Sequence, residues 1–196
     1  MQHKIIETED VVIRFAGDSG DGMQLTGTLF ADASALYGNE ISTFPDYPAE
    51  IRAPQGTVSG VSGFQVHIGS VKINTPGDFC DVLVAMNPAA LKANVKWAKP
   101  TATIIVDADT FDEKGIQRAG YATQDPIAEL NIQDRNLILA PITTLTKESL
   151  KDSGLDNKSI LRCKNMFTLG MCFFIFNKSL DYTYEYLEKK FKKKPN

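Results

Sequence analysis

Four short runs of mostly aliphatic residues constrain the fold of this chain more than any other feature. They are Val11–Phe15, Asp81–Met86, Ala102–Val106 and Asn136–Ala140. Runs of this length that are rich in aliphatic residues are typical of strands buried on both faces of a parallel sheet. Because helical patterns such as Gln24–Tyr37 alternate with them, the sequence predicts βαβ units. We therefore expect an α/β fold, with a three-layer, Rossmann-like architecture around an open, mostly parallel sheet.

The remaining segments add one strand, a hairpin and further helices. A strand is expected over Ile41–Phe44. Thr57–Ile68 alternates apolar with small residues, and together with Val71–Asn74 it predicts a small β-hairpin insertion that turns at Gly69-Ser70. Helical periodicity predicts three more helices, over Ala89–Trp97, Ser159–Phe176 and Tyr182–Phe191.

The length and composition fit one globular domain. The 196 residues lie within the range of a single domain, and 43% hydrophobic with 23% charged residues is ordinary for a chain with a packed core. We therefore expect one α/β domain over residues 1–196. The basic end, residues 189–196, is interpreted either as a helix terminus whose lysines complement the helix dipole or as a linker to a further C-terminal region.

Net charge, cysteine pattern and hydropathy indicate the cellular location and the classes of partner to expect. A net charge of −3 argues against a dedicated nucleic-acid-binding protein. Cys80, Cys163 and Cys172 form no C-x-x-C pair and are expected to be reduced thiols. Met1–Asp10 lacks the apolar segment of a secretory leader. Met166–Phe176 is too short for a membrane span, which needs about 20 residues, and it predicts a buried helix. A cytoplasmic protein without membrane or nucleic-acid partners is expected.

The stretch Ala16–Gln24, AGDSGDGMQ, joins the first strand to the first helix and matches parts of four unrelated motifs. Gly17-Asp18-Ser19-Gly20 also surrounds the nucleophile of chymotrypsin-like proteases, but that serine needs a histidine base oriented by a carboxylate. The chain has two histidines, His3 and His67, which lie near the terminus and in a predicted strand. Ser19 is therefore expected to make local hydrogen bonds in the turn.

Two further interpretations fail on missing partner residues. Gly20-Asp21-Gly22 could begin a thiamine diphosphate site, but the Asn-Asn pair that completes that motif occurs nowhere in the chain. Gly17 and Gly22 have P-loop spacing, but Met23 and Gln24 stand where Lys and Ser or Thr are required.

A dinucleotide-binding turn fits in part. Strand, glycine turn and helix come in the right order, but the third glycine of G-x-G-x-x-G would fall at Leu25. Asp18 and Asp21 would oppose a phosphate at close range unless they face away from it. The amides at the start of the helix could still hold an anion or another polar group.

Three ordered motifs give the chain a resemblance to a known family. Arg14–Gly22, Tyr47–Arg52 and Asp81–Pro88 together resemble the gamma domain of 2-oxoacid:ferredoxin oxidoreductases. The resemblance extends from about Val11 to about Phe191 and is closest to the 2-oxoglutarate branch, in which this domain is fused ahead of the alpha region. The chain departs from the wider family in two motifs, because Ser19 and Asp21 replace a glycine and a glutamine, and Pro48–Pro54 retains only the Glu and the Arg.

The resemblance implies a part of an enzyme that converts a 2-oxoacid, with 2-oxoglutarate the expected one, to an acyl-CoA. Thiamine diphosphate, magnesium and 4Fe-4S clusters would lie on other regions, and ferredoxin would accept the electrons. The expected partners are the alpha and beta regions of the same enzyme. This chain alone would bind none of these groups firmly, and CoA is the ligand it could contact. No residue here is expected to be catalytic or to bind a metal.

The candidate site residues come from the glycine turn, the second motif and the third. Glu50 and Arg52 would share one face of a strand and could bind a CoA phosphate or dock the alpha region, or form a surface ion pair worth about 0–1 kcal/mol. Asn87 lies where open α/β sheets bind ligands, or it only begins a helix. The cofactor-binding candidates are Gly17, Ser19, Gly20, Asp21, Gly22, Glu50, Arg52 and Asn87. The alternative function is a free-standing nucleotide- or CoA-binding module without redox work.

Overall fold

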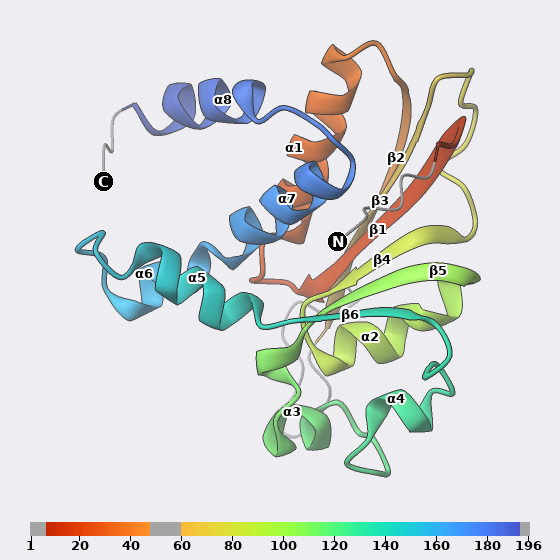
Figure 1. Ribbon diagram of the computed structural model, residues 1–196, viewed down its shortest axis with the longest axis vertical. Helices are drawn as coiled ribbons and strands as arrows, with labels where there is room; N and C mark the ends of the chain where they lie inside the picture. Colours follow the sequence, from red (N-terminus) through yellow and green to blue (C-terminus); the bar gives the residue numbers. More distant parts are fainter. Residues whose placement is uncertain (1–6, 48–59, 193–196) are drawn as a thin grey trace.

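The structure, a computed structural model, describes residues 7–47 and 60–192. Its centre is a six-stranded sheet with strand order β2-β3-β1-β4-β5-β6 (Figure 1). Strands β1, β4, β5 and β6 are parallel to their neighbours in this series, and β3 runs antiparallel to both β1 and β2. The prediction of an open, mostly parallel α/β sheet is confirmed.

The elements follow one another as strands and crossing helices. The strands are β1 Asp10–Asp18, β2 Glu40–Asp46, β3 Val61–Gly69, β4 Cys80–Ala85, β5 Ala98–Asp107 and β6 Asn136–Ala140. The α-helices are α1 Met23–Leu36, α2 Pro88–Asn94, α3 Glu113–Arg118, α4 Pro126–Glu129, α5 Ile142–Leu150, α6 Asn157–Arg162, α7 Lys164–Ile175 and α8 Asp181–Phe191. Two 3₁₀ turns, η1 Val95–Trp97 and η2 Ala108–Thr110, flank β5.

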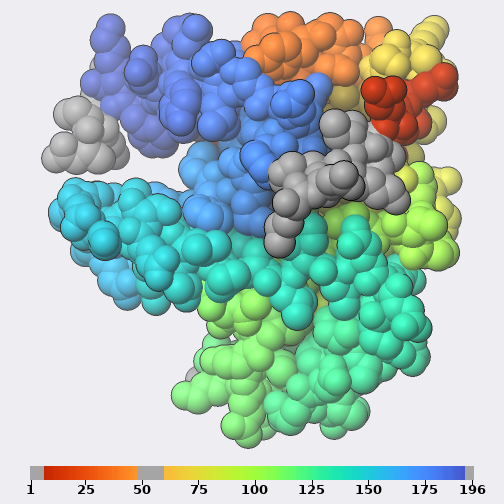
Figure 2. Space-filling view, viewed as in Figure 1, coloured from red at the N-terminus to blue at the C-terminus, as the bar shows by residue number. Residues whose placement is uncertain are grey.

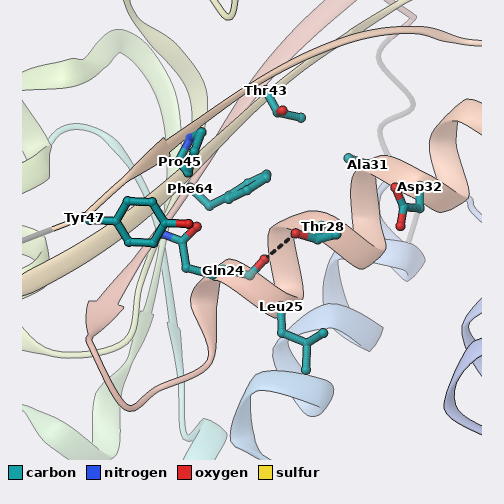
Figure 3. A pocket seen from close by; sticks show the side chains of 9 residues that line it. All are labelled: Gln24, Leu25, Thr28, Ala31, Asp32, Thr43, Pro45, Tyr47 and Phe64. Atoms are coloured by element: carbon teal, nitrogen blue, oxygen red, sulfur yellow. Dashed lines mark hydrogen bonds between the residues drawn. The ribbon is translucent and has the colours of Figure 1, made fainter. Parts of the chain in front are cut away.

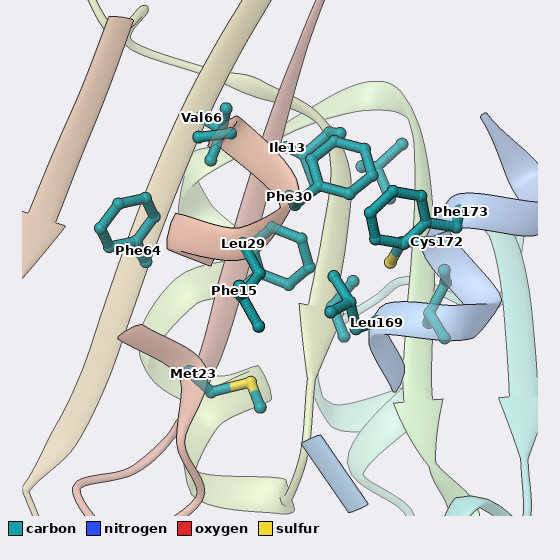
Figure 4. Close-up of a cluster of buried hydrophobic side chains, with 14 of the residues drawn as sticks. Ile13, Phe15, Met23, Leu29, Phe30, Phe64, Val66, Leu169, Cys172 and Phe173 are labelled. Carbon is teal, nitrogen blue, oxygen red and sulfur yellow. The ribbon is translucent and has the colours of Figure 1, made fainter. Parts of the chain in front are cut away.

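Apolar side chains alternate along the strands and build one core on each face of the sheet. On the face covered by α1 and α7, Phe30 lies between Phe15 and Phe173 in edge-on and tilted contacts (Figure 4). On the opposite face, Leu83 and Ile104 pack against Leu91 of α2. Because helices cover both faces, the predicted three-layer arrangement is confirmed (Figure 1).

The predicted hairpin partner of β3 is wrong. Val71–Asn74 forms no strand, and β3 pairs with β2 and β1 instead. Side chains of β3 hold the following loop across the sheet: the Nε2 of Gln65 donates to the carbonyl of Pro76, and the Nδ1 of His67 lies 2.7 Å from the carbonyl oxygen of Thr75. The loop's carbonyls therefore bond to side chains rather than to a neighbouring strand.

The C-terminal helices also differ in detail from the prediction. Ser159–Phe176 is divided at Cys163 into α6 and α7, and three helices, α3, α4 and α5, were not predicted. Met166–Phe176 was expected to be buried, but Phe174 is 80% exposed because it points away from the face of α7 that buries Leu169, Cys172 and Phe173. The C-terminal residues, in cyan to blue, form much of the face in Figure 2.

The basic end begins as helix. Residues 189–191 belong to α8, while 193–196, the rest of the proposed linker, lie outside the described residues. Among residues 7–47 and 60–192, no helix has the length and hydropathy needed to cross a membrane.

Candidate functional site

The carboxyl ends of three neighbouring parallel strands bring polar residues together. Asp18 ends β1, Asn87 follows β4, and Asp107 ends β5. These strands lie side by side in the sheet, so their ends meet at one edge. The glycine turn and Asn87 therefore share this edge, which is the edge at which open α/β sheets bind ligands.

The glycine turn, residues 17–22, is closed by its own hydrogen bonds. The amide of Asp21 donates to the carbonyl of Asp18 at 2.9 Å, and the amide of Asp18 donates back to Oδ2 of Asp21 at 2.9 Å. Ser19 and Gly20 are exposed at its tip. The Asp21 carboxylate thus takes an amide that a phosphate-binding turn would leave for its ligand.

Gly22 begins α1 in a conformation that other residues avoid. Its φ is +73°, and a Cβ built on it would overlap the side-chain amide of Asn165 on α7. A glycine is therefore required at position 22 for two reasons, the left-handed backbone and the close approach of α7.

Asn87 connects the glycine turn to helix α2. Its Oδ1 accepts the amide of Ala90 at 2.8 Å, which caps the helix, and Pro88 follows at the first helical position. Its Nδ2 donates to Oδ1 of Asp18 at 2.9 Å and lies 3.5 Å from Oδ2 of Asp21. Asn87 therefore begins the helix and contacts the predicted turn, and ligand binding by Asn87 stays a prediction.

The electrostatics of the turn centre on Asp21. Burial raises the pKa of its carboxyl, and the neighbouring Asp18 adds to the rise. The hydrogen bond from the Asp18 amide and the positive charge of Lys164 act in the opposite direction. Lys164 also lies 3.7 Å from the fully buried carboxylate of Asp107, so one lysine faces two of the carboxylates at this edge.

Asp107 fixes the segment that follows β6. Its Oδ2 accepts the hydroxyl of Thr143 at 2.6 Å, and its Oδ1 accepts the amide of the same residue at 3.2 Å. Oδ2 of Asp109 accepts the amide of Thr144 at 2.6 Å. The start of α5 is therefore held by carboxylates from the end of β5 and from η2.

A cleft of about 620 Å³ opens beside this edge. Its walls are the turn, the start of α2 and helix α3, and Lys114 and Arg118 lie one helical turn apart on α3. Two cations so spaced could bind phosphate groups. The lining residues are Asp18, Asn87, Pro88, Ala89, Asp109, Thr110, Asp112, Lys114, Gly115, Arg118 and Ala119.

A second hollow, of about 420 Å³, lies on the other face of the sheet, between α1 and edge strand β2 (Figure 3). Gln24 and Tyr47 lie at one end and Asp32 at the other, with Phe64 in the wall. Gln24 therefore faces a region that the site prediction did not include.

The structure brings together six of the predicted residues: Gly17, Ser19, Gly20, Asp21, Gly22 and Asn87. Glu50 and Arg52 lie outside the described residues. Sequence reasoning missed Lys114, Arg118 and Lys164 as site residues. The two α3 cations lie on a six-residue helix with little periodic signal, and Lys164 follows the unpredicted break at Cys163. A usable signal existed only for Asp107, which directly follows a predicted strand.

The sequence profile of the pyruvate ferredoxin/flavodoxin oxidoreductase family matches residues 12–196. The chain belongs to this family. The 2-oxoglutarate oxidoreductase subunit KorA of Mycobacterium tuberculosis is 46% identical to this chain over 187 residues, which are 95% of this chain and 28% of that protein. The 2-oxoglutarate synthase subunit KorC of Methanothermobacter marburgensis is 32% identical over 140 residues, 70% of this chain and 67% of that one. The chain thus spans just over a quarter of the length of KorA.

Solved structures share the fold of this chain. The 2-oxoglutarate:ferredoxin oxidoreductase from Magnetococcus marinus, solved with 2-oxoglutarate, coenzyme A and succinyl-CoA bound, has a TM-score of 0.71 at 29% identity, over 97% of this chain and 28% of that one. The gamma subunit of the keto/oxoacid ferredoxin oxidoreductase from Geobacter sulfurreducens has a TM-score of 0.60 at 19% identity, over 91% of this chain and 85% of that one, and shares the fold.

The titratable groups of the described residues form no evident metal centre. No group of three or more His, Cys, Asp or Glu side chains there could hold a metal ion. Burial raises the pKa of the Cys80 thiol to about 11 and that of Cys172 to about 12, so neither is a ready thiolate.

Proposed function

We propose that this chain is the gamma region of a 2-oxoacid:ferredoxin oxidoreductase, with 2-oxoglutarate as the 2-oxoacid. The assembled enzyme would decarboxylate its substrate oxidatively, transfer the acyl group to CoA and pass the electrons to ferredoxin. The observation that carries this proposal is the 46% identity to KorA over 95% of the chain. The work of this region would be to complete the assembly with the alpha and beta regions and to contribute to the CoA site, in the cytoplasm.

Thiamine diphosphate, bound on another region, would supply the carbanion chemistry of decarboxylation, and clusters elsewhere would carry the electrons. The residues described here would instead contribute to CoA binding. The cleft beside the glycine turn has room for part of a CoA molecule, and Lys114 and Arg118 could pair with its phosphates. Asn87 presents an amide that is already oriented by Ala90 and Asp18, so a polar group of the ligand would meet a preorganised wall.

The test is reconstitution with the regions that carry thiamine diphosphate and the clusters. We expect a stable complex that reduces ferredoxin when both 2-oxoglutarate and CoA are present, and no turnover by this chain alone. Replacing 2-oxoglutarate with pyruvate should lower kcat/KM. Failure to form a complex, together with CoA binding by the isolated chain, would support a free-standing CoA-binding module instead.

Two sets of substitutions test the contribution to the CoA site. Lys114→Ala with Arg118→Ala should raise the KM for CoA about tenfold or more with little change in kcat, because each lost phosphate contact weakens ground-state and transition-state binding alike. Lys189→Ala, which removes an 80% exposed lysine of α8, is the matched control and should change neither value. Arg52→Ala, predicted from sequence, should weaken assembly or raise the same KM while leaving thiamine binding intact.

A further inference from the structure

Lys114 and Arg118, the two cations of the cleft beside the glycine turn, lie on a helix that is too short to hold itself. Helix α3 has six residues, and isolated helices shorter than about 12–15 residues are marginal in water. Its position therefore depends on contacts with other elements. We infer that Tyr121 and Lys92 are positioning residues that hold the end of α3 against α2 and so place the two cations for the phosphates of a ligand in the cleft. The ligand part of this inference rests on the proposed function.

Tyr121 joins the end of α3 to the start of α2. Its hydroxyl donates to the carbonyl of Pro88 at 3.0 Å, and Pro88 is both the first residue of α2 and part of the cleft wall. Its ring is buried with Ile116 of α3 and with Ala119, the residue that follows the helix. Burial raises the pKa of the phenol, so the hydroxyl keeps its proton and remains a donor. The described walls of the cleft do not include Tyr121, so its effect on a ligand would pass through α3.

Lys92 holds the same segment from the last turn of α2. Its Nζ donates to the carbonyl of Gly120 and lies 4.6 Å from the centre of the Tyr121 ring. Glu129 of α4 supports the segment from the other side, because its Oε2 accepts the amides of the two residues after Tyr121, at 2.8 and 2.9 Å. Helices α2, α3 and α4 lie together on one side of the molecule (Figure 1). The segment that follows α3 is thus fixed between α2 and α4.

The placement of these contacts connects them with the cleft. The start of α3 is fixed locally, since the carboxylate of Asp112 accepts the amide of Gly115 at 2.7 Å. Its end, where Arg118 lies three residues before Tyr121, is fixed by side chains that reach α2. The α2 side of the cleft is the wall to which Tyr121 bonds. The attachment therefore sets how far the cations lie from the opposite wall, while the sheet beneath is held by its own pairing.

Hydrogen exchange followed by mass spectrometry tests the attachment without reference to activity. Tyr121→Phe removes the hydroxyl and keeps the ring, and Lys92→Met removes the cation. In each variant of the full chain, residues 113–120 should exchange about threefold faster or more, while β5 is unchanged. Unchanged exchange at residues 113–120 in both variants would overturn the inference.

Helix α8 offers matched controls for both substitutions. There Lys190 lies 5.1 Å from the centre of the Tyr186 ring and donates to its hydroxyl at 3.0 Å. Tyr186→Phe and Lys190→Met therefore make the same chemical changes in a pair away from the cleft. Both controls should leave the exchange of residues 113–120 unchanged, and equal acceleration by the controls would count against a specific role of Tyr121 and Lys92.

Steady-state kinetics of the reconstituted complex test whether the attachment serves the ligand. Tyr121→Phe and Lys92→Met should each raise the KM for CoA about threefold or more with kcat within about twofold, and the two controls should match the unsubstituted complex. In a complex that already carries Lys114→Ala and Arg118→Ala, Tyr121→Phe should raise the KM no further, because it acts through those two cations. A full additional rise in that background, or faster exchange with an unchanged KM, would overturn the inference.

Failure of the proposed function gives a different result. In that case the unsubstituted complex shows no CoA-dependent turnover, whatever the state of α3. The exchange experiment then decides alone whether Tyr121 and Lys92 hold this helix.

Discussion

Gly22 is the residue whose replacement should be least tolerated in the glycine turn. Its φ of +73° disfavours any residue with a Cβ, and the side chain of Asn165 occupies the space that a Cβ would need. We expect Gly22→Val to lower the free energy of unfolding by about 1–3 kcal/mol. Urea denaturation followed by circular dichroism measures this change.

Gly20 provides the control for this prediction. It lies two residues earlier in the same turn, and a Cβ built on it meets no atom within 4 Å. Gly20→Ala should therefore leave the midpoint of unfolding nearly unchanged. Equal effects at the two glycines would show that the turn does not depend on the left-handed backbone at Gly22.

Asp21 should make stability depend on pH in a defined direction. Burial raises the pKa of its carboxyl above the usual value of 3.8, so the folded protein holds the proton more tightly than the unfolded chain. The stability that it contributes is therefore full below this usual value and is lost as the pH rises through the higher pKa of the folded state. Asp21→Asn, which carries no charge at any pH, should gain on the unsubstituted protein as the pH rises from about 4 to about 7.

Urea unfolding of both proteins across this pH range measures the difference. If the free energy of unfolding of Asp21→Asn minus that of the unsubstituted protein stays constant or falls with rising pH, the assignment is contradicted. Asp156→Asn is a useful comparison, because hydrogen bonds from Ser159 lower the pKa of the exposed Asp156 below the usual value of 3.8. The stability lost in this variant should therefore be constant from about pH 4 to about pH 7 and should become smaller as the pH falls below that usual value.

At the scale of elements, helix α2 depends on one side chain for both its start and its attachment to the turn. Asn87→Ala removes the cap on Ala90 and the amide that Asp18 and Asp21 share. We expect a loss of about 1–2 kcal/mol in the free energy of unfolding. Asn87→Ser keeps a capping oxygen but lacks the amide, so the difference between the Ser and Ala variants measures the cap alone. Identical stabilities of all three proteins would refute both roles.

The elements also show which helices and strands local sequence patterns can predict and which they cannot. The strands β1, β4, β5 and β6 were predicted because buried parallel strands read as aliphatic runs bounded by turn residues. Helices α3 and α4 were missed because six and four residues are too few to show a helical period. The prediction of a strand at Val71–Asn74 was wrong. The carbonyls of the residues that follow, Thr75 and Pro76, bond to the side chains of His67 and Gln65, and local alternation does not reveal such contacts.

At the scale of the whole molecule, the two cores share one sheet and should unfold together. Phe30 is fully buried on the α1 face and Leu83 on the α2 face. Phe30→Ala should cost about 3–5 kcal/mol and Leu83→Ala about 2–5 kcal/mol, each with a single transition, because every central strand contributes to both cores. Calorimetry tests this expectation, and two separate transitions in either variant would show that the faces unfold independently.

The sequence by itself determined the fold class and the edge of the sheet at which the site lies. Hydrophobic periodicity is a local property, and parallel strands must end at the same edge, so Gly17–Gly22 and Asn87 had to meet there. Only the tertiary structure decided which side chains join them. Lys164, Lys114 and Arg118 come from helices whose positions depend on how they pack, and Arg14 is paired with residues 32, 51 and 80 positions away. Contacts over such distances are selected by the packing of the whole chain, because no short window of sequence contains both partners.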